Sequence, residues 1–392
     1  MAGVAQRMGT VPDGEGNTGF GETLIVSDLH LRSGSDRAGA ADFARLVSSA
    51  SGPGARLVLA GDIFDLDWVG RAPRSGESTA AAAGRLRAIL EEFPEVQDGL
   101  RAFLRRGGEI VWLPGNHDAE LAHPEVQAAL KESLGRPGER LRFEAEAADM
   151  DGIRIEHGHQ HDPDNRFLPD TREAVLRGRL SDFPLGCLLT RFLLSRLPYY
   201  RERGDQHRTP WQTFLGVLRD FGWRTPWMVL LYFWAGLRIA RRAGRLPTGA
   251  DSFVTMRSPL AVIRRMYLDR MALGAILAIC LILLPIAPSA GDGRLWLLLA
   301  SLALALWLAI PPYRRHEYFE RARRESTAAA RGLLSGGFRE VVLGHTHRAG
   351  EEALPEGRVV FLGAFQFAGP RGRPFARIRG GQSELDWLPP MG

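Results

Sequence analysis

Residues 56–65 read RLVLAGDIFD, and this stretch decides the fold class. Its first half is a short apolar run of the kind that forms a buried strand, and its second half is a turn that carries Asp62 and Asp65. Two other apolar runs, Thr23–Ser27 and Glu109–Leu113, also end in turns with polar residues, and helix-like stretches lie between the runs. The alternation predicts an α/β fold.

The same pattern returns late in the chain. The short apolar runs Val341–Leu343 and Arg358–Gly363 are again followed by polar turns, after an interruption of very different composition. We therefore expect one α/β domain that is assembled from two separate sequence blocks.

Five short motifs rich in Asp, Asn and His follow these strand-like runs. In a parallel sheet that position is the carboxyl edge, where open α/β folds bind ligands. Residues two apart in a strand project to one face, so paired side chains can reach one point. Carboxylate and amide oxygens mixed with imidazoles suit manganese, iron or zinc rather than copper. The motifs are Asp28-Leu29-His30, Gly61-Asp62-Ile63-Phe64-Asp65, Gly115-Asn116-His117-Asp118, His157-Gly158-His159 and Gly344-His345-Thr346-His347.

Each motif alone has an ordinary structural explanation. A lone histidine is more often a surface or core residue than a metal ligand, and an Asn-His-Asp run can cap a helix or form a turn. All five motifs together, each after a predicted strand, favour a metal site over coincidence.

With these motifs in this order, the chain resembles the calcineurin-like metallophosphoesterases over about Glu22–Gln160 and Glu340–Phe365. The resemblance implies a four-layer αββα sandwich with two divalent metal ions at the edges of facing sheets. It further implies that Asp62 bridges the two ions. The implied ligands are Asp28, His30 and His347 for one metal and Asn116, His157 and His345 for the other.

The resemblance also implies the chemistry. A pair of divalent cations acidifies water and clamps the phosphoryl oxygens of a phosphate ester. His117 matches the family's histidine that is not a ligand, which protonates the leaving oxygen, and Asp118 is expected to orient it. We interpret Asp65 as structural. Because His159 and His161 lie in the same loop as His157, the choice of His157 as the ligand rests on the family's His-Gly-His pattern.

Composition and charge limit the possible partners. The chain has 392 residues, 45% hydrophobic and 24% charged, which is ordinary for a folded protein. Its formal net charge is +5, but residues 171–270 hold 18 Arg against 7 acids, a local net charge of +11. Such a segment predicts an anionic partner, either nucleic acid or a lipid surface. Cys187 and Cys280 have no metal or redox spacing, so we expect a reducing compartment and no disulfide framework.

Two long uncharged stretches follow the basic segment. Met271–Ala290 and Leu295–Tyr313 contain no charged residue, and Gly291–Arg294 between them is typical of a turn. A helical span of a bilayer core needs about 20 such residues, so we expect a transmembrane hairpin. The alternative is a pair of buried helices in a water-soluble domain, although such helices usually carry polar residues on one face.

Arginines flank both outer ends of the expected hairpin, with Arg264, Arg265 and Arg270 before it and Arg314 and Arg315 after it. An excess of basic residues marks the cytoplasmic side of a membrane protein. We therefore expect a membrane protein whose catalytic domain lies in the cytoplasm.

The segment before the hairpin interleaves arginines with aromatic residues. Phe221–Leu237 contains three tryptophans, and its apolar part Pro226–Leu237 is too short to span a bilayer, which favours a helical cap at the membrane surface. The alternative is a helical insertion whose tryptophans form a core. The expected organisation is a flexible tail (1–20), a first part of the catalytic domain (21–170), a helical cap (171–270), the hairpin (271–290 and 295–313) and a second part of the catalytic domain (314–392).

The substrate class is the least defined expectation. The motif with Asp62 and Asp65, followed by Trp68 and a helical insertion, is distantly similar to the UDP-2,3-diacylglucosamine diphosphatases. Those enzymes commonly have Arg where this chain has His117, and their insertion lacks a hairpin. We therefore expect a lipid-linked phosphoester or pyrophosphate, with manganese as the first-choice metal. The alternatives are a nuclease or cyclic-nucleotide phosphodiesterase, for which nucleic acid would be the anionic partner, and a non-enzymatic scaffold.

Overall fold

The computed structural model describes residues 21–35, 37–50, 54–69, 79–178, 183–192, 194–196, 210–243, 259–266, 268–284, 290–309 and 315–389, so the tail expected at 1–20 lies outside the described residues. The chain forms two compact units. The sheet unit consists of the described residues of Met1–Leu66, Ser78–His161 and Arg324–Gly392, and the helical unit of those of Asp67–Glu77 and Asp162–Arg323. The helical unit thus begins nine residues earlier and ends ten residues later than the segment 171–313 expected from sequence.

The first sheet of the sheet unit has six strands in the order β11-β10-β1-β2-β3-β4. Its first four strands in sequence run parallel, and β10 pairs antiparallel with β1, with Leu24 opposite Arg377. The strands are β1 (Thr23–Val26), β2 (Arg56–Ala60), β3 (Glu109–Leu113), β4 (Leu141–Phe143), β10 (Arg373–Arg379) and β11 (Gln382–Leu388).

The second sheet has five strands in the order β5-β6-β7-β9-β8. The three central strands are parallel, and the two edge strands are antiparallel to their neighbours. Parallel pairing of β6 with β7 joins the two sequence blocks, because Glu156 lies opposite Leu343. The strands are β5 (Ala147–Met150), β6 (Ile153–Glu156), β7 (Glu340–Leu343), β8 (Gly350–Leu354) and β9 (Gly357–Phe361).

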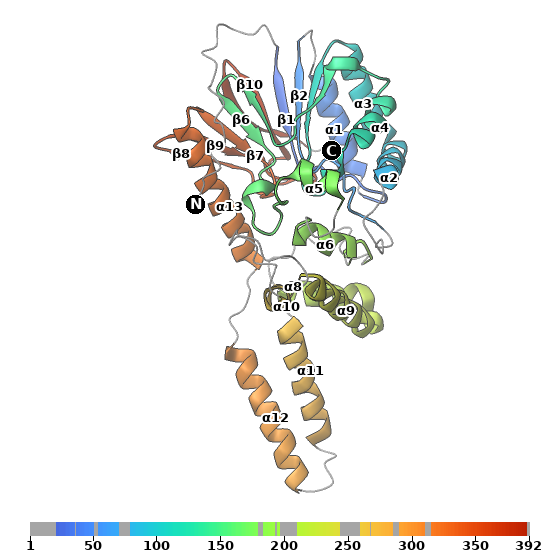
Figure 1. The fold of residues 1–392 in the computed structure, drawn as a ribbon, viewed down its shortest axis with the longest axis vertical. Coiled ribbons are helices and arrows are strands. Elements are labelled where there is room, and N and C mark those ends of the chain that lie inside the picture. Colours follow the sequence, from blue (N-terminus) through green and yellow to red (C-terminus); the bar gives the residue numbers. More distant parts are fainter. Residues whose placement is uncertain are drawn as a thin grey trace. The chain divides into compact units, whose positions relative to one another are not determined.

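Helices cover the outer faces of both sheets (Figure 1). Side chains along β1 point alternately to the two faces of its sheet. Leu24 and Val26 pack against the helices, whereas Ile25 faces the second sheet. On the second sheet, Ala330 and Leu334 pack against its strands. The order helix, sheet, sheet, helix confirms the predicted mixed α/β fold with two facing sheets. The helices on the first sheet are α1 (Arg37–Ser49), α2 (Thr79–Glu92), α3 (Pro94–Arg105) and α4 (Pro124–Ser133), and the helix on the second is the part of α13 (Arg315–Ser335) from Arg324 onward.

The helical unit is built around one small apolar cluster. Leu185, Ile239 and Leu268 are buried in it. Gly236 lets two helices approach closely, because a Cβ there would lie 2.6 Å from Leu268 Cδ1. The helices are α5 (Thr171–Arg177), α6 (Leu185–Phe192), α8 (Pro210–Phe221), α9 (Thr225–Ala243), α10 (Pro259–Arg265), α11 (Leu268–Leu283) and α12 (Ala290–Ala309). Short 3₁₀ turns complete the described chain at Ala119–Ala122, Gly138–Arg140, His159–His161, Leu194–Arg196 and Gly222–Arg224.

The expected hairpin differs from the helices that form. Helix α11 begins earlier and ends at Leu283, before Pro285, because a proline disfavours helical conformation in the residue that precedes it. Helix α12 begins at Ala290, so Gly291–Arg294 belongs to a helix and not to the expected turn. Residues 285–289 and 310–313 of the two stretches lie outside the described residues.

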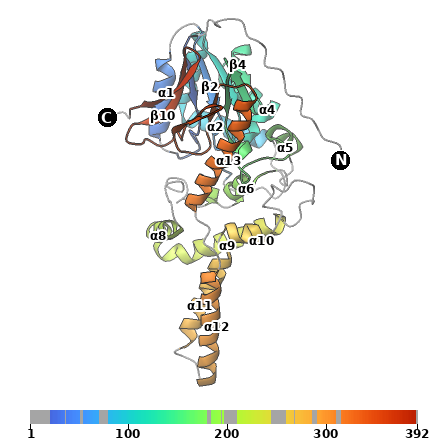
Figure 2. The ribbon, with the colours of Figure 1, turned by 90° about the vertical axis from the view of Figure 1, so that its left-hand side faces the viewer.

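The prediction of transmembrane spans is not supported. Among the residues that the structure describes, no helix is both long enough and apolar enough to cross a membrane. The alternative prediction, a pair of buried helices, is not supported either. Ile282 and Leu298 expose about two thirds of their surface, at 66% and 65%. The two helices lie side by side in both views (Figure 2).

Candidate metal centre

The predicted ligands follow the ends of strands from both sheets. In the first sheet Asp28 follows β1, Asp62 follows β2 and Asn116 follows β3. In the second sheet His157 follows β6 and His345 follows β7. Because these strands are parallel within each sheet, their carboxyl ends meet at one edge. The fold therefore brings five motifs together that are scattered over the sequence.

The backbone at most of these residues has left-handed conformation. φ is 56° at Asp28, 52° at His30, 53° at Asp62, 63° at His345 and 54° at His347. Residues other than glycine adopt this region rarely, and each such residue costs of order 1–3 kcal/mol unless its surroundings impose it. Such residues cluster at functional sites, so the backbone marks the same positions as the sequence motifs.

The first cluster consists of Asp28, His30 and His347. His347 Nε2 lies 3.1 Å from Asp28 Oδ1, and His30 Nε2 lies 3.8 Å from the same oxygen. The two imidazole Nε2 atoms are 3.2 Å apart. One ligand atom from each residue thus lies within 4.8 Å of the others, an arrangement that can hold a metal ion.

The second cluster consists of Asp62, His157 and His345, with Asn116 beside it. His157 Nε2 lies 3.2 Å from Asp62 Oδ2 and 3.3 Å from Asn116 Oδ1. Asp62 Oδ2 also lies 4.0 Å from His30 Nε2, an atom of the first cluster. Asp62 therefore stands between the two clusters, where a bridging ligand is expected.

Two buried oxygen atoms test whether this site fits a metal. Asp28 and Asp62 expose 0% and 1% of their surface. Asp28 Oδ1 and Asp62 Oδ2 have no hydrogen-bond partner among the described residues, and both face imidazole nitrogens. A buried carboxylate oxygen without a partner is costly, and a divalent cation satisfies it. The donor set fits two divalent metal ions.

Three glycines leave the space that the ligands occupy. A Cβ at Gly115 would lie 2.1 Å from Asp62 Oδ1, and one at Gly344 would lie 2.8 Å from Asp28 Oδ2. At Gly61, which also has φ of 83°, it would lie 2.5 Å from the His157 ring. Glycine precedes the ligands in these motifs because no side chain fits there.

The ligand His30 is held from behind. Its Nδ1 lies 2.7 Å from Asp65 Oδ1, and Arg32 donates to the other oxygen of the same carboxylate. This contact fixes the ring so that Nε2 points to the cluster, as carboxylates commonly do for metal-binding histidines. From the sequence, Asp65 was interpreted as structural, and Arg32 was not predicted to take part. The spacing of three residues from Asp62 was the only signal for Asp65.

The loop after β9 is held against the first ligand. The N–H groups of Phe365 and Gln366 donate to the carbonyl groups of Ser27 and Asp28, at 3.2 and 3.0 Å. Arg373 donates to the carbonyl groups of both loop residues and pairs with the buried Asp42 carboxylate at 2.6 Å. This network ties the last part of the chain to the backbone of Asp28.

The charged groups of the site shift one another's pKa values. Burial alone would raise the pKa of Asp28, but its contacts with His30 and His347 lower it far below the usual range. Burial likewise opposes but does not prevent a lowered pKa of Asp62, which faces His157. The pKa of His157 is raised to about 9, because the charge of Asp62 outweighs the effect of burial. The carboxylates likewise raise the pKa of His30 despite its burial, so in the absence of metal both His30 and His157 favour the protonated form.

Asp118 contacts main chain. Its two oxygens accept hydrogen bonds from the N–H groups of Gly115, Asp62, Ile63 and Phe64, at 2.6 to 3.3 Å. Burial and the nearby Asp62 charge raise its pKa to about 7. The carboxylate joins the two loops that carry Asp62 and Asn116. The expected role in orienting His117 stays a prediction.

His117 lies at the open side of the site. Its N–H donates to Asp62 Oδ1 at 2.8 Å, and its ring is 5.2 Å from the His30 ring, edge to face. The side chain is only partly buried, unlike the ligands Asp28 and His157. This position allows contact with a substrate.

The three histidines of the same loop have different surroundings. His157 Nδ1 lies 2.9 Å from the Ala60 carbonyl oxygen, which leaves Nε2 for the cluster. His161 Nε2 lies 2.6 Å from Glu156 Oε2, and His159 is buried with its ring 5.3 Å from that of His157. Burial and the neighbouring His157 lower the pKa of His159 well below the usual value, which keeps it neutral. The geometry favours His157 over the other two as the ligand.

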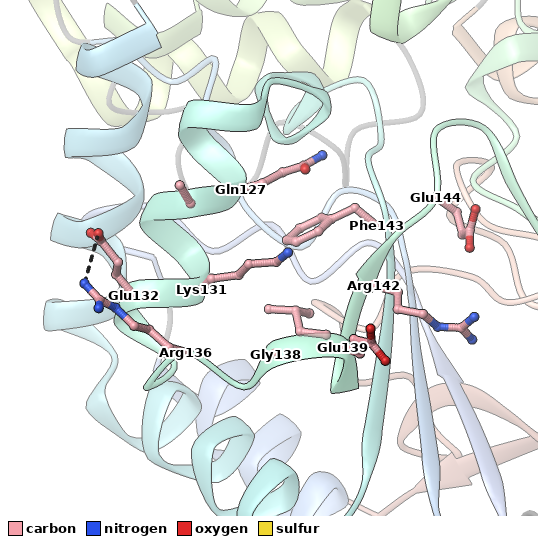
Figure 3. A pocket seen from close by; sticks show the side chains of 11 residues that line it. Gln127, Lys131, Glu132, Arg136, Gly138, Glu139, Arg142, Phe143 and Glu144 are labelled. Atoms are coloured by element: carbon pink, nitrogen blue, oxygen red, sulfur yellow. Dashed lines mark ion pairs between the residues drawn. The ribbon is translucent and has the colours of Figure 1, made fainter.

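A separate pocket of the sheet unit contains none of these residues. A cavity of about 870 Å³ lies between α4 and β4 and is lined by Lys131, Arg136, Glu139 and Phe143 among others (Figure 3). None of the predicted ligands lines this pocket. The candidate site is therefore identified by the chemistry of the ligand clusters, and not by the size of a cavity.

Comparison with known proteins agrees with this placement. The family model described as calcineurin-like phosphoesterase matches residues 22–223. The matched region holds Asp28, Asp62, Asn116 and His157, whereas His345 and His347 lie beyond it and reach the site through the fold. Comparison with curated proteins gives no match.

Proposed function

Because the chain belongs to the calcineurin-like phosphoesterase family, whose members are metal-dependent hydrolases of phosphoester bonds, we propose that it hydrolyses a phosphoester or pyrophosphate bond of a lipid-linked substrate. The family binds two divalent metals, and we propose Mn²⁺ for both positions, with iron or zinc as alternatives. A donor set of carboxylates, one amide and imidazoles supports this choice.

The observation that carries the proposal is the pair of buried carboxylate oxygens, Asp28 Oδ1 and Asp62 Oδ2, that face imidazoles from both sequence blocks. When bound, two divalent cations lower the pKa of water and neutralise charge on the phosphoryl group. The chain's part is to hold seven donor groups at the adjoining edges of the two sheets, with the backbone fixed in advance.

His117 carries the proton in this proposal. Its ring stands at the open side of the clusters, and the contact of its N–H with Asp62 fixes its backbone relative to the ligand clusters. A partly exposed imidazole there can protonate the oxygen of the leaving group, a task in general acid catalysis that needs a pKa near neutrality. Asp118 supports His117 indirectly, by joining the loops that carry Asp62 and Asn116.

A lipid-linked substrate is supported by the composition of the helical unit. Its sequence combines a large excess of Arg with tryptophans that are exposed, including Trp223 at 85%. Arginine beside exposed tryptophan and leucine suits an anionic lipid surface better than nucleic acid, which calls for phosphate contacts with little apolar area. The expected membrane location, with the catalytic residues on the cytoplasmic side, stays a prediction.

The deciding experiment is a hydrolysis screen of the purified full chain with Mn²⁺. The substrates are lipid pyrophosphates, simple aryl phosphodiesters, cyclic nucleotides and nucleic acids. Preference for the lipid pyrophosphates supports the proposal, and preference for nucleic acids or cyclic nucleotides replaces it with a nuclease or phosphodiesterase.

The site assignment is tested separately with Asp62→Ala. The change removes the group between the two clusters, so activity on every substrate should be lost, and bound metal should fall from two ions toward one or none. Metal analysis of the purified variant gives the answer. If the variant still binds two ions and turns over at a near-normal rate, the assignment of Asp62 as the bridging ligand is wrong.

A further inference from the structure

The two helices α11 and α12 expose apolar side chains to an unusual degree. Ile279 and Ile282 of α11 are 53% and 66% exposed, and Leu298 and Leu308 of α12 are 65% and 67% exposed. Proteins rarely leave large contiguous apolar surfaces in water, so a surface of this kind indicates a partner.

Exposed leucines lie on every side of α12 except the side that packs against α11. Leu297, Leu298, Leu304 and Leu306 are all exposed, although at 100° per residue they point in different directions. The buried positions are small, Ala300 and Ala303, as expected where α12 packs closely against α11. A protein partner covers one stripe of a helix, whereas fluid hydrocarbon covers all of it. The distribution therefore favours lipid.

A polar boundary marks one end of the pair. Arg270, near the start of α11, stacks over the ring of Trp307, near the end of α12, at 5.0 Å. From Met271 to Leu283 and from Leu295 to Ala309 there is no charged residue. Arginine and tryptophan are the side chains that stand where hydrocarbon meets headgroups, because each has an apolar body and a polar end. With a rise of 1.5 Å per residue, each uncharged stretch extends about 20 Å beyond this boundary.

Helix α9 adjoins the same end. Gly236 of α9 packs against Leu268 at the start of α11. Its outward side chains Trp227 and Trp234 are 59% and 57% exposed, and the exposed Arg238 and Arg241 continue the row along the helix. This row, which we call the α9 stripe, has tryptophans for an interface and cations for anionic headgroups.

We propose that α11 and α12 are embedded in the hydrocarbon of a lipid bilayer and that the α9 stripe lies on its anionic headgroups. The partner is lipid, and a second copy of the chain is the alternative occupant. The proposal concerns the helical unit and holds whether or not the proposed substrate is correct.

The test is flotation of the full chain with vesicles of phosphatidylcholine, with and without phosphatidylglycerol. Full-length protein should float with both and should resist extraction by carbonate. The double variant Leu298→Asp with Leu302→Asp should lose flotation on phosphatidylcholine alone, because each aspartate at the centre of an apolar helix lowers partition into lipid by roughly 100-fold. The matched control is Leu176→Asp, which changes a leucine of the same unit that is 49% exposed but lies on α5, and it should float as the parent does.

Charge reversal separates the two parts of the proposal. Arg238→Glu with Arg241→Glu should remove the preference for phosphatidylglycerol and leave flotation on phosphatidylcholine intact, because only the α9 stripe depends on charge. Hydrolysis of a soluble aryl phosphodiester, measured in every variant, should stay unchanged and shows that the sheet unit is folded. Protein that stays in the lipid-free fraction would overturn the proposal. A discrete oligomer of that protein, formed without detergent, would identify a second copy as the partner.

Discussion

Gly115→Ala is the most direct test of the metal centre, because it adds a single carbon atom next to the bridging carboxylate. The new Cβ would lie 2.1 Å from Asp62 Oδ1 and 2.4 Å from Asp62 N. Gly115 does not have positive φ, so alanine can adopt its backbone conformation. The effect of the substitution is therefore a steric effect on Asp62 and not backbone strain.

The size of the effect follows from these distances. Ordinary contact begins at about 3.4 Å, so Asp62 Oδ1 has to move by about 1.3 Å. Rotation of the carboxylate alone is not enough, because the main-chain nitrogen is also too close. A displacement of about 1 Å in a catalytic group costs roughly 100-fold in rate, and overpacking costs about 1–3 kcal/mol of stability. We expect at least a 100-fold loss of activity together with weaker metal binding.

The assay is hydrolysis of an aryl phosphodiester with Mn²⁺, with metal content and thermal unfolding measured on the same samples. Gly84→Ala is the matched control, because Gly84 is exposed in the middle of α2 and a Cβ there would meet no atom within 4 Å. It should keep full activity and gain about 0.5–1 kcal/mol of stability, the usual difference between glycine and alanine in a helix. Near-normal turnover of Gly115→Ala with two metals bound would refute the geometry of Asp62.

Three further changes test the surroundings of the site. Asp65→Asn keeps the shape of the side chain but removes the charge behind His30, so chelator competition should show metal affinity reduced by about 10- to 100-fold, and unchanged affinity would mean that this contact does not orient the ligand. His117→Ala should keep both metals and slow the release of an alcohol more than that of nitrophenolate, which needs little protonation; equal losses would count against the role as an acid. Arg373→Met removes the buried partner of the Asp42 carboxylate at 2.6 Å and leaves it only Arg45 at 3.0 Å, so the free energy of unfolding should fall by about 2 kcal/mol in a denaturant titration, whereas a loss below about 1 kcal/mol would show that the loop after β9 is held by other contacts.

The sequence predicted the part of the structure that depends on short-range pattern. Apolar runs followed by Asp28, Asp62 or His345 identified strands and the turns at their ends, because strand periodicity and glycine-containing turns are local properties. The grouping of those turns at one edge followed from parallel pairing. The left-handed φ at Asp28 and Asp62 could not be predicted, since only the packed surroundings hold a residue other than glycine there.

Contacts between groups that are distant in the sequence could not be predicted from it. Asp118 was expected to orient His117, yet its carboxylate also accepts hydrogen bonds from a loop more than fifty residues away, such as the one from Ile63 N at 2.9 Å. Arg32 was not predicted for the same reason, because its role depends on its contact in space with Asp65. Only three-dimensional packing decides which of several nearby polar groups a buried carboxylate meets.

The limits of the two apolar helices were mispredicted for a local reason. Counting uncharged residues placed the first helix end at Ala290 and a turn at Gly291–Arg294, whereas α11 ends at Leu283 and α12 begins at Ala290. Charge was the wrong criterion, because the proline at 285 limits a helix more strongly than a glycine or an aspartate does.

The joining of β6 to β7 across the helical unit has a consequence for synthesis on the ribosome. Asp28 accepts a hydrogen bond from the N–H of His345, 317 residues later in the chain. At translation rates of about 5–20 residues per second, roughly 15 to 60 s pass between the appearance of these two residues. Throughout that interval the nascent chain contains the carboxylates Asp28 and Asp62 but lacks His345 and His347. Strand β6 meanwhile has no β7 to pair with. Catalytic activity therefore begins only after His345 and His347 have left the ribosome, so synthesis of the helical unit delays the first turnover.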